Sequence, residues 1–167
     1  MSVVGAGPSP ADRLAIAAVI DTGLWALDTR DLEVYLATFW PDASFSEVGP
    51  DGALGVWHGI DDIRRMSAAR VGGPTGRQHR LSNTLFIPRE PAAGASEGRP
   101  PGEAWTAWAY WMTSVRHPET GEVRFEMSGY LRDELERRDG EWRLLGRHLD
   151  GWPGDLRHPL RTVGTTG

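Results

Sequence analysis

Residues 104–116 read Ala-Trp-Thr-Ala-Trp-Ala-Tyr-Trp-Met-Thr-Ser-Val-Arg, and they indicate the architecture more clearly than any other stretch. We predict a long strand here, in which Trp105 and Trp111 share one face while Trp108 and Tyr110 share the other. Both faces are apolar, whereas a strand with one solvated face alternates apolar with polar residues. We therefore expect both faces to be covered, with helices and a cavity over Trp108 and Tyr110 and a second subunit over Trp105 and Trp111.

The segments around this strand predict an α+β fold, with helices first and a meander of long strands after them. Residues 9–12, Ser-Pro-Ala-Asp, are a typical helix start, and apolar residues follow at helical spacing as far as Leu27. A break near Asp28 or Thr29 then starts a second helix. The expected helices are 10–27, 28–40 and 59–71, and the expected strands are 43–45, 54–57, 79–89, 104–116, 123–136 and 142–149.

The length of 167 residues predicts a single domain with its own core. We expect this domain to cover 10–152, between a flexible N-terminus at 1–9 and a tail at 153–167. The Pro/Gly-rich segment 90–103 is expected to be a loop.

Composition excludes several classes of function. The net charge is −5 and there is no basic stripe, which argues against nucleic-acid binding. The chain has no cysteine, so disulfides, zinc–thiolate sites and thiol nucleophiles are excluded. Neither a signal peptide nor a membrane-spanning apolar run is recognisable. We expect a cytoplasmic protein without a metal site or a cofactor.

Two proton-transfer groups about fifty residues apart lie at element boundaries beside apolar sequence. They are Asp28, where the helical pattern breaks, and His79, where a strand begins. A carboxylate and an imidazole are suitable partners for general acid–base chemistry. Asp28 is equally compatible with a helix cap, and His79 with a structural histidine. Asn83 shares the face of His79 by alternation and can hold a substrate oxygen or satisfy a backbone group.

Several segments together resemble the SnoaL-like and scytalone-dehydratase-like branch of the nuclear-transport-factor-2-like superfamily, over roughly residues 10–152. This resemblance implies a cone, in which a strongly bent antiparallel or mixed sheet wraps around the N-terminal helices and a deep apolar pocket opens at one end. The segments that carry it are Leu27 to Leu32, Phe39 to Ala43, Gly59-Ile60, Gln78-His79, Gly129-Tyr130 and Asp139 to Arg147.

The resemblance also implies roles for individual residues. In scytalone-dehydratase-like enzymes an aspartate at the helix break works with a histidine at a strand start, and Asp28 and His79 match these positions. A second pocket histidine on the next strand has no counterpart, since Trp108 and Tyr110 are nearest to its place. Leu27 stands where the family has a pocket tyrosine.

The leading hypothesis is a cofactor-free acid–base enzyme that dehydrates, isomerises or cyclises a hydrophobic polyketide-like or aromatic small molecule. His79 is the expected general base, and Asp28 orients its imidazole. Tyr110 and Asn83 are expected to polarise or hold substrate oxygens. The other expected substrate contacts are Trp108, Tyr35 and Arg147.

Two alternatives remain open. One is a non-catalytic binding or structural subunit similar to the small subunit of ring-hydroxylating dioxygenases, with the pocket filled by side chains. The other is an epoxide hydrolase that uses Arg132, Asp133 and Asp150, although adjacent strand residues such as Arg132 and Asp133 point to opposite faces. In each case we expect a homodimer formed through the face of the long strands.

Overall fold

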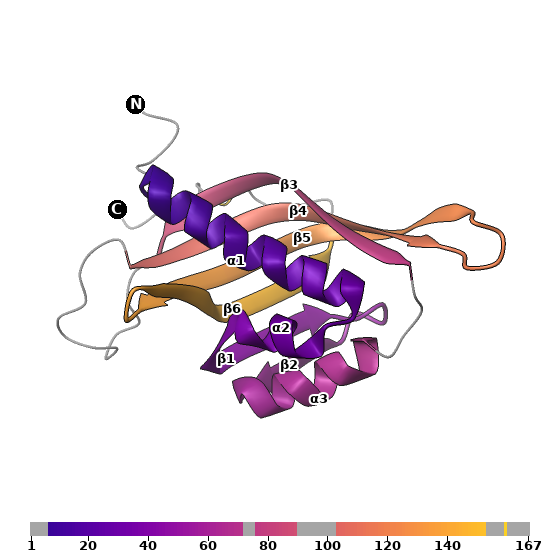
Figure 1. Cartoon of the computed structure of the whole chain (residues 1–167), viewed down its shortest axis with the longest axis horizontal. Coiled ribbons are helices and arrows are strands. Elements are labelled where there is room, and N and C mark those ends of the chain that lie inside the picture. Colours follow the sequence, from indigo (N-terminus) through magenta and orange to yellow (C-terminus); the bar gives the residue numbers. More distant parts are fainter. Residues whose placement is uncertain (1–6, 72–75, 90–102, 153–158, 160–167) are drawn as a thin grey trace.

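The computed structural model describes residues 7–71, 76–89, 103–152 and 159 (Figure 1). Predictions for the terminal segments and for the loop at 90–103 fall almost wholly outside these residues. Within the described residues there are three helices and six strands, which follow one another along the chain as α1 (Pro10–Thr29), α2 (Leu32–Ala37), β1 (Phe39–Val48), β2 (Leu54–His58), α3 (Gly59–Val71), β3 (Arg77–Pro88), β4 (Ala104–Arg116), β5 (Val123–Arg138) and β6 (Glu141–Gly151).

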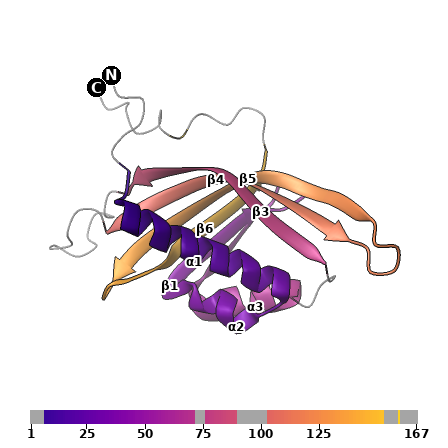
Figure 2. The ribbon, with the colours of Figure 1, turned by 45° about the horizontal axis from the view of Figure 1, so that its top comes forward.

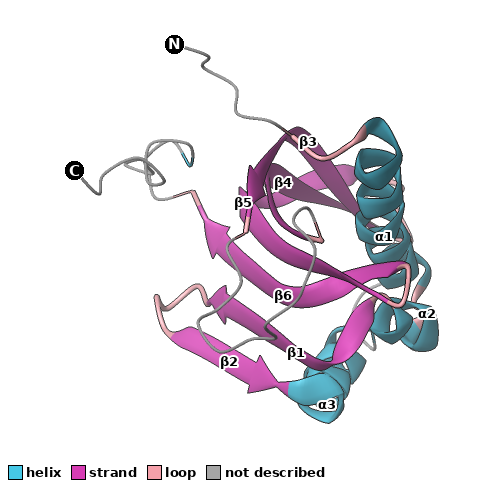
Figure 3. Ribbon diagram, turned by 90° about the vertical axis from the view of Figure 1, so that its left-hand side faces the viewer, coloured by secondary structure: helices cyan, strands magenta, loops and turns pink. Residues whose placement is uncertain are grey.

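The six strands form one mixed sheet in the order β2-β1-β6-β5-β4-β3. Only the pair of β1 and β6 is parallel, and every other neighbouring pair is antiparallel. The sheet is bent, and all three helices lie on one of its faces, which we call the inner face (Figure 3). The predicted α+β class with a bent mixed sheet around N-terminal helices is confirmed.

The first two helices are separated by a short break whose position differs from the prediction. Arg30 adopts a left-handed conformation with φ of 65° and ends α1, so Asp28 lies in the last turn of that helix. Asp31 caps α2 by accepting a hydrogen bond from the backbone N–H of Val34 at 3.0 Å. The expected helix start at Asp28 or Thr29 is therefore wrong, because the capping carboxylate belongs to Asp31.

The core lies between α1 and the inner face of the sheet, across which α1 runs diagonally (Figure 2). Ile16, Ile20 and Leu24 recur every four residues and form one buried stripe of α1. Trp105 and Ala107 of β4 join the same core cluster. Small side chains at alternate positions of β4 leave room for a helix above the sheet.

The two faces of β4 are opposite to the predicted assignment. Trp105 and Trp111 lie on the inner face, whereas Tyr110 is 47% exposed on the outer face and Trp108 stacks there on Tyr130. Alternation along one strand separates two sets of residues, but the pairing with neighbouring strands determines which set meets the helices.

No helix in the described part of the chain is both long enough and apolar enough to cross a membrane.

Candidate active site

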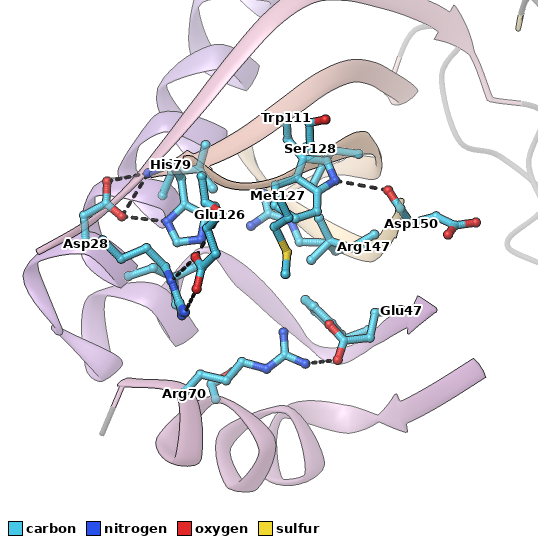
Figure 4. A pocket seen from close by; sticks show the side chains of 18 of the residues that line it. Asp28, Glu47, Arg70, His79, Trp111, Glu126, Met127, Ser128, Arg147 and Asp150 are labelled. Atoms are coloured by element: carbon cyan, nitrogen blue, oxygen red, sulfur yellow. Dashed lines mark hydrogen bonds and ion pairs between the residues drawn. The ribbon is translucent and has the colours of Figure 1, made fainter. Parts of the chain in front are cut away.

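A cavity of about 620 Å³ opens between the helices and the inner face of the sheet (Figure 4). This volume is within the range of small-molecule sites. All three helices contribute to its wall, together with every strand except β2. Its apolar lining includes Leu24, Leu27, Phe45, Leu81, Trp111, Leu131 and Leu149.

Asp28 and His79 form a hydrogen-bonded pair in the wall of this cavity. The Asp28 carboxylate accepts a bond from the His79 ring at 2.6 Å, between Oδ1 and Nδ1. It also accepts the His79 backbone N–H, at 3.0 and 3.2 Å from its two oxygens. Because an ionised carboxylate only accepts, the Nδ1 atom carries a hydrogen, and in the neutral ring this tautomer has its lone pair on Nε2. The side chains of His79 and Asp28 are 21% and 17% exposed, so the pair is accessible from the cavity.

The elements that carry this pair explain why the two residues meet. Asp28 occupies the last turn of α1, and the backbone of β3 begins beside that turn. His79 and Leu81 alternate onto the inner face, where they pair with Thr113 and Trp111 of β4. The carboxylate therefore binds the strand backbone and the imidazole together, which fixes both the place and the tilt of the ring.

A second carboxylate lies near the ring on the strand side of the cavity. Glu126 of β5 accepts two hydrogen bonds from Arg77, at 2.8 and 2.5 Å, and one from the Thr113 hydroxyl at 3.1 Å. The bonds from Arg77 are the main reason that the pKa of Glu126 lies below its usual range, with smaller contributions from Thr113 and His79. Arg77 precedes His79 by two residues and shares its face, so alternation could have identified it as a cavity residue.

An ion pair between Arg70 of α3 and Glu47 of β1 lies across the cavity from His79 (Figure 4). The Arg70 guanidinium also lies over the rings of Phe45 and Trp57, at 5.2 and 5.9 Å from their centroids. These contacts combine charge with apolar packing in the wall opposite the Asp28–His79 pair.

A fourth pair in the cavity wall, Arg147 and Asp133, is deeply buried. Arg147 of β6 donates two hydrogen bonds to Asp133 of β5, from Nε at 2.8 Å and from Nη2 at 2.7 Å. The two side chains are 1% and 0% exposed. Burial raises the pKa of Asp133, and the guanidinium of Arg147 opposes this shift. Burial raises the pKa of the Tyr35 phenol of α2, and the charge of Arg147 opposes this shift.

Of the predicted substrate contacts, Tyr35 and Arg147 line the cavity with Asp28 and His79. Asn83 does not, although alternation from His79 predicted it. The register between β3 and β4 shifts between Ser82 and Leu85, and Asn83 has a φ of 55° at this bulge. A bulge interrupts alternation, which is why Asn83 is exposed.

Tyr110 and Trp108 do not line the cavity either, because they point to the outer face of the sheet. Tyr110 pairs with Ser82, whereas the inward Leu81 pairs with Trp111. Trp111 instead takes the aromatic position in the cavity wall, and its indole N–H donates to the Asp150 carbonyl oxygen at 3.3 Å.

The outer face carries its own connected set of polar and aromatic side chains. Ser46 and His148 are hydrogen-bonded at 2.9 Å through Nδ1, and Nε2 of His148 lies 3.4 Å from the Tyr130 hydroxyl. Tyr130 stacks on Trp108 with 5.4 Å between ring centroids. Burial is the main cause that lowers the pKa of His148, and Arg132 adds to it.

The residues considered for an epoxide hydrolase are not assembled in one place. Asp133 is buried against Arg147, whereas the guanidinium of Arg132 lies 5.7 Å from the centroid of Trp108 on the outer face. In the described part of the chain, no three His, Asp or Glu side chains gather closely enough to hold a metal ion.

Solved structures with the same fold come from several bacteria. Aln2 from a Streptomyces species is 20% identical, with a TM-score of 0.68 over 86% of this chain and 92% of that chain. ActVI-ORFA from Streptomyces coelicolor is 23% identical, with a TM-score of 0.66 over 83% and 95%. A candidate scytalone dehydratase from Novosphingobium aromaticivorans is 17% identical, with a TM-score of 0.62 over 83% and 82%. No curated protein sequence matches the chain.

The bent mixed sheet around N-terminal helices is the fold of similar solved structures, among them an NTF2-like protein with a cystatin-like fold from Novosphingobium aromaticivorans, which is 20% identical with a TM-score of 0.64 over 87% of this chain and 85% of that chain. More narrowly, the family model of the SnoaL-like domain matches residues 9–148, and the chain belongs to this family. The resemblance noted in the sequence is thereby confirmed.

Proposed function

We propose that this protein is a cofactor-free acid–base enzyme of the dehydratase, isomerase or cyclase type. Its substrate would be a hydrophobic small molecule of polyketide-like or aromatic structure. The observation that carries this proposal is the hydrogen bond of 2.6 Å between Asp28 and His79 in the wall of an open cavity. Membership of the SnoaL-like family and the fold shared with a candidate scytalone dehydratase support it.

In this proposal His79 is the general base, and its Nε2 atom accepts a proton from a carbon or oxygen of the substrate. Asp28 holds the hydrogen on Nδ1 and stabilises the imidazolium that forms, as the carboxylate does in a hydrolase triad. The apolar part of the lining is suited to a hydrophobic substrate. The proton on His79 is then available to a leaving hydroxyl or to another carbon, which gives water loss or isomerisation.

The rival function is a non-catalytic subunit with a filled pocket. The open cavity argues against it, since neither Trp108 nor Tyr110 occupies the space between the helices and the sheet. A solely structural role for the Asp28–His79 pair stays the alternative that an experiment must test.

Proton abstraction can be measured before the natural substrate is identified. We would incubate the protein in D₂O with aromatic ketones such as 2-tetralone and anthrone, and follow deuterium incorporation by mass spectrometry. His79→Ala is expected to reduce the exchange rate by about 10²–10⁴-fold, the usual effect of losing a general base. His58→Ala is the matched control, because His58 is exposed and does not line the cavity. Equal exchange by wild type and His79→Ala would contradict the assignment.

We further propose that two copies associate through the outer face of the sheet. Tyr110 and Met112 are 47% and 43% exposed there, beside the Trp108–Tyr130 stack. An exposed apolar and aromatic sheet face is suited to a self-complementary contact.

A further inference from the structure

We propose that Tyr35 is the hydrogen-bond donor that receives the oxygen of the substrate, and that the Asp133–Arg147 pair positions it. This inference rests on the proposed acid–base function and specifies the substrate as a compound with a carbonyl group next to the carbon that loses a proton. It gives Tyr35 the oxygen-polarising role that the sequence suggested for Tyr110.

The phenol of Tyr35 has a defined direction for its hydrogen. The guanidinium of Arg147 lies close enough to the phenol of Tyr35 to interact with it electrostatically, and an arginine side chain can only donate hydrogen, so it cannot accept the O–H hydrogen. The O–H hydrogen of Tyr35 then remains for another acceptor. Within residues 7–71, 76–89 and 103–152 the hydrogen bonds found at Tyr35 are all made by its backbone N–H and carbonyl oxygen. The ring of Tyr35 lies in the wall of the cavity, which is where an acceptor can enter.

The protonation state of Tyr35 is suited to this role. Burial is the largest contribution to its pKa, which lies above the usual 10.0, while the charge of Arg147 opposes the shift. The phenol therefore keeps its proton at neutral pH and acts as a donor. Tyr35 is only 2% exposed, so bulk water competes weakly for its hydrogen.

The position of Arg147 is fixed by its other contacts. Two of its nitrogens bind Asp133, and its guanidinium carbon lies 5.8 Å from the centroid of Phe39. Phe39 also packs edge-on against Tyr35, with 5.1 Å between ring centroids. The guanidinium and both rings thus form one packed unit, and the positive charge of Arg147 favours negative charge that develops on an oxygen bound to Tyr35.

The step is balanced without a co-reactant. His79 removes a proton from the carbon next to the carbonyl group, and the electron pair of that C–H bond moves to form a carbon–carbon double bond. The carbonyl π electrons move to oxygen, which becomes an enolate oxygen that accepts the hydrogen bond of Tyr35. The proton held on His79 returns to carbon or leaves with a hydroxyl group.

The test uses 4-nitrophenol, whose phenolate form imitates an enolate oxygen and absorbs visible light. We expect wild-type protein to bind the phenolate more tightly than the phenol, and to convert bound probe to the coloured form at a fixed pH. Tyr35→Phe keeps the ring and its contact with Phe39. It should reduce the ratio of phenolate to phenol affinity by about 10- to 100-fold, the effect of losing one hydrogen bond to a charged acceptor. Thermal melting would verify that the variant is folded.

Two further variants separate the possible explanations. His79→Ala should keep the phenolate preference, because His79 is not the group that binds the oxygen. Arg147→Lys should reduce the phenolate preference and leave the affinity for neutral phenol unchanged, whereas a merely structural role would weaken both.

An unchanged phenolate preference in Tyr35→Phe would overturn the proposal, and so would an absence of probe binding at millimolar concentration. If only His79→Ala lost the phenolate preference, the phenolate oxygen would bind at His79, and the proposal for Tyr35 would be overturned. Deuterium exchange keeps the two hypotheses distinct. If His79→Ala stops exchange but Tyr35→Phe does not, the role of Tyr35 fails and the general base stands; if His79→Ala exchanges normally, the acid–base function itself fails.

Discussion

Replacing Asp28 by alanine removes the acceptor for two donors of His79 that tie α1 to β3, the backbone N–H, which is shared between both carboxylate oxygens, and the ring. A hydrogen bond to a charged group contributes about 1.5–3 kcal/mol, and a buried donor left without an acceptor costs about 1–3 kcal/mol. Water replaces part of this loss, because the side chains of His79 and Asp28 are 21% and 17% exposed. We therefore expect the free energy of unfolding to fall by about 2–4 kcal/mol in Asp28→Ala. Asp28→Asn keeps one oxygen acceptor and should lose about 1–2 kcal/mol.

Urea unfolding followed by far-ultraviolet circular dichroism would measure these differences. Asp21→Ala is the matched control, because Asp21 is exposed on the same helix and does not line the cavity. Nitrogen-detected NMR of His79 adds a second readout. Wild type should carry its hydrogen on Nδ1, and the carboxamide of Asp28→Asn can donate to Nδ1 and move that hydrogen to Nε2. Stability of Asp28→Ala within about 0.5 kcal/mol of wild type, the range of a neutral surface change, would refute the reasoning.

Two further predictions concern the outer face and pH. Tyr110→Arg places a charge on the proposed contact and should convert a dimer to a monomer in sedimentation velocity. Trp111→Arg should instead disturb the cavity. A wild-type protein that is monomeric at micromolar concentration would contradict the dimer. Burial, with help from Arg132, lowers the pKa of His148 from 6.5. Its contribution to stability is thus complete above about pH 6.5 and is lost as the pH falls below that value, because the unfolded chain takes up the proton first. Urea midpoints measured down to about pH 5 should show this loss in wild type and not in His148→Gln.

The order of elements could be predicted from the sequence because each depends on local signals. Ser9 and Pro10 start α1, and the Ser9 hydroxyl does accept the backbone N–H of Asp12 at 3.1 Å. The apolar run at residues 104–116 predicted β4, and turn signals at residues 118–121 and 139–140 separated β4, β5 and β6. The parallel pairing of β1 with β6 could not be predicted, since it joins segments about a hundred residues apart and no local pattern encodes it.

The site was predictable only in part, for the same physical reason. Asp28 and His79 could be proposed as partners because each lies at an element boundary. In the structure, Oδ1 of Asp28 lies 2.6 Å from Nδ1 of His79. Tyr110 could not be placed correctly, because the inner face of β4 is defined by its register with β3 and by the helix that covers it. Asn83 was misplaced by a bulge that carries no sequence signature, since its left-handed backbone is tolerated by asparagine but not required by it.

The stability of the fold gives little reason for the buried pair of Asp133 and Arg147. A fully buried ion pair often stabilises a fold no better than apolar side chains of the same volume, because both charges lose their hydration. Leu131 and Leu135, which flank Asp133 on the same strand, are apolar and almost fully buried. An apolar pair at positions 133 and 147 would therefore suit the core equally well. The buried charge of this pair has a function if it acts on Tyr35 and on a substrate oxygen in the cavity. A fixed dipole in a site that excludes water needs no reorganisation when negative charge develops. The cost of burying Arg147 would then be a requirement of the chemistry, not of the fold.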